Sequence, residues 1–187
     1  MAEQLIKVSD RNFRLYLSQE QILAEVNRVA AQINEDLRDK HPLFVCVLNG
    51  AFVFASDLFR RITIPDAEIT FIRMKSYEGT QSTGKVKTVA GLHESIVDRT
   101  VVVIEDIVDS GYTMQRLVHQ LKDDLGAREV LISVLLNKPN ARKVEGLHID
   151  YCCLEIPNDF IVGYGLDYNE QGRNLPDIWV VATSEED

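Results

Sequence analysis

Cysteine is scarce in this chain, and its spacing is not that of a structural cross-link or a zinc site. Only Cys46, Cys152 and Cys153 occur among 187 residues, and none belongs to a Cys-x-x-Cys pair. The four histidines are equally scattered, at His41, His93, His119 and His148. A disulfide framework or zinc site needs more ligands at closer, regular spacings. The pattern instead predicts free, buried thiols in a reducing cytosol.

Long apolar segments are also missing. No apolar run approaches the length needed to span a bilayer. The N-terminus, Met-Ala-Glu-Gln-Leu-Ile-Lys, lacks the apolar centre of a signal peptide. We therefore expect a soluble cytoplasmic protein without a membrane partner.

Basic charge is in deficit as well. The chain has 20 Lys and Arg against 29 Asp and Glu, which gives a formal net charge of −9. This balance argues against nucleic acid as a partner, because such binding depends on broad contact with phosphates. Small anions remain possible ligands, since backbone amides and a few cations can control the potential of one pocket. The length and the 45% hydrophobic content predict a single globular domain over residues 1–187.

Periodicity predicts alternating helices and strands. Ser18 and Gln21 have the spacing of a capping box, and apolar residues recur on one helical face from Ile22 to Leu37. A second helix is expected over about 51–61. Strands are expected at residues 43–48, 68–74, 101–104, 130–136, 151–156, 160–164 and 178–181. This alternation predicts an α/β fold with a mostly parallel sheet flanked by helices.

The most informative segment is residues 101–114, Val-Val-Val-Ile-Glu-Asp-Ile-Val-Asp-Ser-Gly-Tyr-Thr-Met. Its four β-branched residues predict a strand buried on both faces, with Glu105 and Asp106 where that strand should end. A turn rich in hydroxyls precedes a helical pattern of apolar residues, at Met114, Leu117, Val118, Leu121 and Leu125. This order places a phosphate at a helix N-terminus and places carboxylates near sugar hydroxyls or a metal. An isolated Asp-Ser-Gly, by contrast, is often only a helix cap.

The whole segment resembles the phosphoribosyl-diphosphate signature of the purine phosphoribosyltransferases. The match comprises six residues: Glu105, Asp106, Asp109, Ser110, Gly111 and Thr113. The resemblance implies that Glu105 and Asp106 hold the ribose hydroxyls and contribute to a Mg²⁺ site. It makes Asp109 the general base, and it forms the 5-phosphate cradle from Ser110, Gly111, Tyr112 and Thr113. Tyr112 replaces a lysine of some relatives.

The turn after residues 43–48 resembles the pyrophosphate loop of the same family. Leu48, Asn49 and Gly50 would bind the diphosphate through main-chain N–H groups, and the glycine allows close approach. Several relatives carry a basic residue where this chain has Asn49. In this family the turn can hold a non-proline cis peptide bond, which here would join Leu48 and Asn49; the sequence alone does not decide whether it is present.

Residues 75–91 form a long segment rich in glycine and hydroxyl side chains, which is typical of a functional lid or of a flexible hairpin. Lys75-Ser76-Tyr77 resembles the tip of the family's mobile active-site loop. By that resemblance, Ser76 and Tyr77 would cover the diphosphate and exclude water.

Two further segments resemble the base-binding parts of the hypoxanthine and hypoxanthine-guanine members. Lys138, which follows an expected strand, would donate to the purine 6-oxo group. In the C-terminal segment, Phe160 would stack on the base and the main chain of Ile161 would read its edge. Asp167 would bind Mg²⁺, and Arg173 would reach the pyrophosphate.

The resemblance extends from about residue 43 to 181 and implies the type I phosphoribosyltransferase fold. That fold would include a small hood from about 138–187 with N-terminal residues. The expected reaction transfers 5-phosphoribosyl from its 1-diphosphate to N9 of hypoxanthine, and of guanine, in a homodimer or homotetramer. One alternative is a non-catalytic regulator on the same fold that senses the diphosphate and binds nucleic acid. A phosphatase-like hydrolase is a further alternative, but no companion nucleophile motif accompanies it.

Overall fold

The computed structural model describes residues 4–74, 89–90 and 92–182, and a six-stranded sheet forms its centre. The sheet has the order β5-β4-β3-β6-β7-β8. Its strands are β3 (Leu43–Leu48), β4 (Glu68–Met74), β5 (Val89–Ala90), β6 (Thr100–Val108), β7 (Glu129–Asn137) and β8 (Tyr151–Glu155). Five of them are parallel, and only β5 pairs antiparallel, with β4. The predicted α/β class is confirmed.

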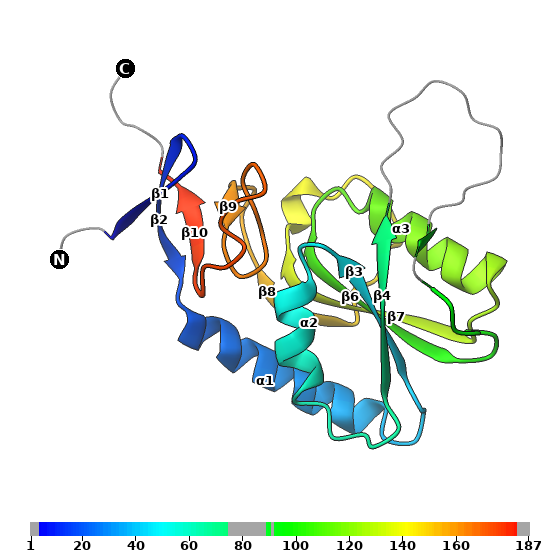
Figure 1. Ribbon diagram of the computed structural model, residues 1–187. Helices are drawn as coiled ribbons and strands as arrows, with labels where there is room; N and C mark the ends of the chain where they lie inside the picture. Colours follow the sequence, from blue (N-terminus) through cyan, green and yellow to red (C-terminus); the bar gives the residue numbers. More distant parts are fainter. Residues whose placement is uncertain (1–3, 75–88, 91, 183–187) are drawn as a thin grey trace, which may run out of the picture.

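Helices cover both faces of this sheet (Figure 1). On one face lie α1 (Gln19–Asp36) and α2 (Phe52–Phe59), which share one core cluster with the sheet. On the other face lies α3 (Tyr112–His119), whose last turns continue as a π-helix over Gln120–Asp124. A 3₁₀ turn, Pro139–Ala141, follows β7. Burial on both faces explains why β3 and the first half of β6 are continuous apolar runs.

The start of α1 confirms the predicted capping box. The Ser18 hydroxyl accepts a hydrogen bond from the Gln21 N–H at 3.3 Å, and the Gln21 amide oxygen accepts one from the Ser18 N–H at 2.9 Å. These bonds satisfy N–H groups that have no partner within the helix. The buried stripe of α1 then packs on the sheet, as the spacing of its apolar residues predicts.

A second, four-stranded antiparallel sheet lies beside the first (Figure 1). Its order is β1-β2-β10-β9, with β1 (Leu5–Val8), β2 (Arg11–Leu17), β9 (Ile161–Val162) and β10 (Ile178–Val181). The sheet joins N-terminal to C-terminal strands and occupies the place of the expected hood, whereas β8 from the expected hood range belongs to the central sheet. The hairpin β1–β2 was not predicted, because charged and polar residues interrupt its apolar pattern.

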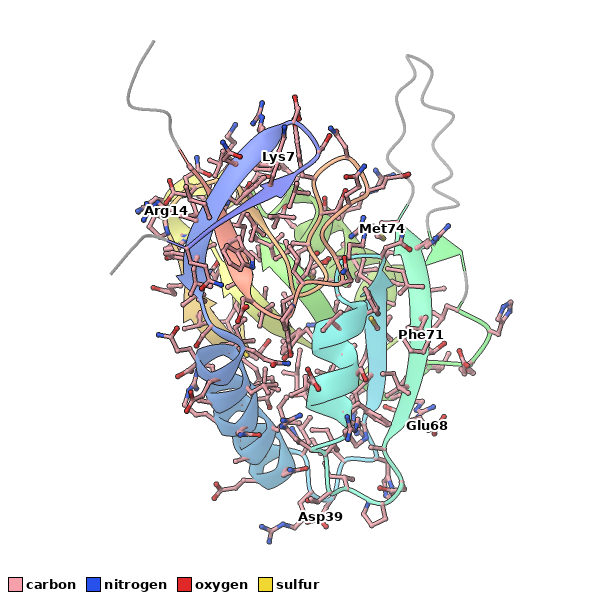
Figure 2. All side chains as sticks on the ribbon, turned by 60° about the vertical axis from the view of Figure 1, so that its left-hand side comes forward. Lys7, Arg14, Asp39, Glu68, Phe71 and Met74 are labelled. Carbon is pink, nitrogen blue, oxygen red and sulfur yellow. The ribbon has the colours of Figure 1, made fainter. Side chains whose placement is uncertain are left out.

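The loops that matter for function follow the carboxyl ends of the parallel strands. Figure 2 shows Glu68 and Met74 at opposite ends of β4. The carboxyl ends of β3, β6 and β7 lie at the Met74 end, because these strands run parallel to β4. Parallel α/β sheets bind their ligands at this edge. Within the described part of the chain, no helix has the length and apolar character required to cross a membrane.

Candidate active site

The turn between β6 and α3 forms a small pocket. A cavity of about 100 Å³ is lined by Glu105, Ile107, Val108, Asp109, Ser110, Gly111, Thr113 and Met114. Gly111 has φ of 87°, in the left-handed region that suits glycine. A Cβ at this position would also lie 2.6 Å from Val144 Cγ2 and 2.8 Å from Arg142 Cδ. The glycine of the signature is therefore required both by its backbone conformation and by its neighbours.

Glu105 and Asp106 lie within β6 and not after it, which corrects the expected strand end at residue 104. The strand continues to Val108, and β7 pairs with it over the same length. Burial and the neighbouring Asp106 carboxylate raise the pKa of Glu105 well above its ordinary value. Asp106 accepts a hydrogen bond from the Ile107 N–H at 2.8 Å. Two neighbouring carboxylates, of which Glu105 lines the pocket, are thus held close enough for their like charges to repel.

The turn after β3 packs directly against this acidic pair. The Leu48–Asn49 peptide bond is cis, a conformation that the family resemblance allows at this turn and that the sequence left open. A Cβ on Gly50 would lie only 1.6 Å from Asp106 Oδ2. Gly165 meets the same turn from the C-terminal segment, since a Cβ there would lie 2.2 Å from the Gly50 carbonyl oxygen. Glycines at these positions allow three segments distant in sequence to meet at one point.

Arg73 is a cation beside this turn that sequence reasoning did not single out. Its guanidinium Nη2 donates a hydrogen bond to Asn49 Oδ1 at 2.8 Å. Arg73 lies near the carboxyl end of β4 and pairs in register with Leu48. The sequence signal that could have identified Arg73 was a basic residue near the end of an expected strand. That strand lies next to the strand that precedes the Leu48–Gly50 turn. Arg73 therefore places a positive charge beside Asn49, the position at which several relatives carry a basic residue.

Lys138 lies buried after β7, with 7% of its surface exposed. Its backbone N–H donates to the Val108 carbonyl at 2.9 Å, so it lies beside Asp109 across the strand pair. Its ammonium donates to the Asp159 carbonyl at 2.8 Å. A buried ammonium requires hydrogen-bond acceptors. Because Asp159 precedes Phe160 in the chain, the hydrogen bond from Lys138 connects the central sheet with the hood.

Phe160 immediately precedes the short strand β9, which begins at Ile161. The Phe160 carbonyl accepts a hydrogen bond from the Val181 N–H of β10 at 2.9 Å. Phe160 is 42% exposed, whereas Ile161 is 5% exposed and belongs to the core. An aromatic face is therefore available to a planar ligand, while the Ile161 side chain is committed to packing.

Asp167 and Arg173 are brought together as an ion pair. Arg173 Nη2 lies 2.5 Å from Asp167 Oδ1, and Arg173 Nη1 donates to the Gly165 carbonyl at 2.8 Å. Asp167 Oδ2 accepts from the Glu170 N–H at 2.8 Å. Since Gly165 packs on Gly50, this pair lies close to the turn after β3.

The donor set is compatible with Mg²⁺ held partly by a substrate. Within the described residues, no three His, Cys, Asp or Glu side chains converge into a complete metal cage. Mg²⁺ usually keeps several waters and binds through one or two carboxylates together with substrate phosphates. Glu105, Asp106 and Asp167 supply hard oxygen ligands of that kind.

The remaining predicted residues divide into two groups. Tyr112 and Thr113 are exposed at the start of α3, and Asp109 and Ser110 precede them in the same turn. Ser76 and Tyr77 lie outside the described residues. The other predicted residues gather at one edge of the central sheet. They come from the signature, the turn after β3 and the C-terminal segment.

Comparison with known proteins gives a consistent match. Residues 15–169 match the family model of the phosphoribosyl transferase domain. The chain is 40% identical over 169 residues to a hypoxanthine-guanine phosphoribosyltransferase of Streptococcus thermophilus, covering 90% of this chain and 92% of the relative. A Streptococcus mutans protein of the same name is 39% identical over 182 residues, covering 97% and 96%.

Solved structures agree with the sequence matches. The crystal structure of a hypoxanthine phosphoribosyltransferase from Staphylococcus aureus has a TM-score of 0.81 and 37% identity, covering 90% of each chain. A hypoxanthine-guanine-xanthine phosphoribosyltransferase structure has a TM-score of 0.80 and 31% identity, covering 91% of this chain and 97% of the other. The chain belongs to the phosphoribosyltransferase family, among its hypoxanthine-guanine members.

Proposed function

We propose that this protein is a purine salvage enzyme that transfers 5-phosphoribosyl from 5-phosphoribosyl 1-diphosphate to N9 of hypoxanthine, and of guanine. The products are IMP or GMP and pyrophosphate. One observation carries the proposal: β6 and β7 pair in register at Val108 and Asn137, so Asp109 and buried Lys138 follow side by side. A proton acceptor for the base and a donor for its oxo group thus belong to one site.

The phosphoribosyl group is bound by the turn from Asp109 to Thr113. The cavity of about 100 Å³ and the start of α3 supply hydroxyls and N–H groups for the 5-phosphate. Glu105 and Asp106 hold the ribose hydroxyls. Their negative field also stabilises positive charge that develops on ribose C1 as the diphosphate leaves.

The purine is held between the central sheet and the hood. Phe160 stacks on its face, the Ile161 main chain reads its edge, and the Lys138 ammonium donates to the 6-oxo oxygen. That ammonium already has a carbonyl partner at Asp159, which fixes its position before the base enters. Asp109 accepts the N7 proton while N9 attacks ribose C1, so it acts as the general base.

The diphosphate is bound by the Leu48–Gly50 turn and by Arg173. When bound, Mg²⁺ supplies Lewis-acid neutralisation of the leaving pyrophosphate, and Glu105, Asp106 and Asp167 are the residues that would hold it. Arg173 adds a guanidinium suited to phosphate oxygens. Ser76 and Tyr77 complete the proposed diphosphate contacts from residues 75–91, the segment that the family resemblance assigns to a loop covering the site.

We further propose that residues 1–187 act as one catalytic unit in the cytoplasm, as a homodimer or homotetramer, on small molecules alone. The regulator alternative requires nucleic-acid binding, and neither the described site nor the relatives reported above favours it.

A pyrophosphate-release assay tests the proposal. With Mg²⁺ and 5-phosphoribosyl 1-diphosphate, release should require hypoxanthine or guanine and should be weak with adenine. Release without any base would indicate a hydrolase. No release with any purine, in protein that still binds the diphosphate, would favour a regulator.

A further inference from the structure

The ring of Phe160 is one of three aromatic rings that pack together in the hood. The Phe160 and Tyr168 ring centroids are 5.6 Å apart at 81°, an edge-to-face arrangement. Phe13 of β2 lies 6.3 Å from Phe160 and 6.1 Å from Tyr168. Phe13 is fully buried, whereas Phe160 keeps 42% of its surface exposed. These distances fall in the range where aromatic pairs attract beyond simple burial.

Residues at the turn between β1 and β2 contact the side chain of Tyr168. The Arg11 guanidinium carbon lies 5.1 Å from the centroid of the Tyr168 ring, a cation–π contact. The Asp10 carboxylate faces the Tyr168 hydroxyl, and this interaction raises the pKa of Tyr168 and lowers that of Asp10. Tyr168 is therefore fixed on its face and at its hydroxyl by two consecutive residues of the hairpin.

We propose that the N-terminal hairpin is a positioning element of the purine site, acting through Tyr168 on the ring of Phe160. Asp10 and Arg11 orient Tyr168, and Tyr168 together with Phe13 sets the plane in which Phe160 meets the base. The inference rests on the proposed function, because it takes Phe160 as the residue that stacks on the purine. Arg11 and Tyr168 are positioning residues and do not touch the substrate.

Restricting a ring before binding improves affinity because less side-chain freedom is lost when the base arrives. The effect should appear in purine binding, since the contacts converge on Phe160 and not on the phosphate turn. The KM for hypoxanthine should therefore rise when the hairpin contacts are removed. The KM for 5-phosphoribosyl 1-diphosphate and the kcat at saturating base should stay within about twofold.

Three variants test the chain of contacts. Tyr168→Leu removes the ring and should raise the hypoxanthine KM by up to about tenfold. Arg11→Gln removes only the cation and should raise it about two- to fivefold. Tyr168→Phe keeps the ring but loses the hydroxyl that faces Asp10, so its effect should be smaller than that of Tyr168→Leu. Lys7→Ala on β1 of the same hairpin is the matched control and should leave both KM values unchanged.

A double-mutant cycle then separates this proposal from the proposed function. If Phe160→Leu alone leaves the hypoxanthine KM unchanged, the stacking role fails, and this inference fails with it. If Phe160→Leu raises that KM but neither Arg11→Gln nor Tyr168→Leu does, only the hairpin proposal is overturned. It is supported when Arg11→Gln adds no further loss in a Phe160→Leu background, because the two changes then act on one contact chain. Full additivity would overturn it, and Arg11→Gln is an exposed substitution that serves even if Tyr168→Leu does not fold.

Discussion

The phosphate-binding and base-binding regions of this site are built in different ways. In the proposed function, nine consecutive residues from Glu105 to Thr113 supply the acidic pair, the general base and the phosphate turn. The proposed base-binding region draws on Lys138 after β7, Phe160 just before β9, and Tyr168 with the hairpin β1–β2 around it. One region is a local motif between a strand and a helix, whereas the other exists only after the hood sheet has formed.

This difference has a physical reason. A phosphate needs hydroxyls and N–H groups that a single turn can present, so its binding residues lie together in sequence. A planar base needs one aromatic face and donors at its edge. Those groups must come from different directions, and here they come from strands that are distant in the chain.

Asp109→Asn is the substitution within the local motif with the largest expected effect. The loss of a general base costs about 10²–10⁴-fold in kcat, while the side chain keeps its size. Steady-state rates and calorimetric binding of 5-phosphoribosyl 1-diphosphate should show lost turnover with affinity almost unchanged. Turnover within a few-fold of the parent protein would remove Asp109 from the role of base.

Lys138→Ala tests the region that depends on tertiary structure. A buried oxo group without its charged donor should cost about 1.5–3 kcal/mol in transition-state binding. The kcat/KM for hypoxanthine and for guanine should therefore fall about 10- to 150-fold, with diphosphate affinity largely retained. The parent protein assayed with adenine is the control, because an ammonium opposes the exocyclic amine. Intact 6-oxopurine rates in the variant, or adenine as the preferred base, would contradict the assignment.

Gly50→Ala tests whether the local turn depends on its neighbours. The added Cβ would lie 1.6 Å from Asp106 Oδ2, and overpacking of this kind typically costs about 1–3 kcal/mol. Thermal unfolding should show a lower Tm, and the diphosphate KM should rise because Asp106 is displaced. Gly146→Ala is the control: φ there is +73°, but nothing lies within 4 Å of the new Cβ. It should lower the Tm without changing the kinetics, and equal kinetic effects in both variants would argue against the Gly50–Asp106 contact.

Arg73→Gln should have the smallest effect of the four. Loss of the guanidinium beside Asn49 should raise the diphosphate KM about three- to tenfold, as expected for one charge-assisted contact, with the hypoxanthine KM unchanged. Arg99→Gln is the matched control, because Arg99 pairs with Glu68 at the other end of β4, at 2.7 Å. An unchanged diphosphate KM in Arg73→Gln would show that the cation at this position does not reach the ligand.

Strand and helix prediction was most accurate where the pattern was local and strong. The strand at residues 178–181 and the capping box at Ser18 appear as predicted. The strand expected over 101–104 is longer, since pairing with β7 continues through the acidic residues. The helix predicted toward Leu125 ends in a π-helix, a change of backbone pattern that apolar spacing cannot indicate.

The fold class, the proposed phosphate turn and the chemical types at the candidate site could be predicted from the sequence alone, because they depend on short-range patterns and on one contiguous motif. Tertiary structure alone decided that Arg73 meets Asn49, that Asp167 pairs with Arg173, and that Asp10 and Arg11 hold Tyr168. These contacts join residues through the register of paired strands, the close approach of glycines and the packing of the hood. The spacing of residues along the chain does not specify which side chains meet, even where a motif singles out one partner.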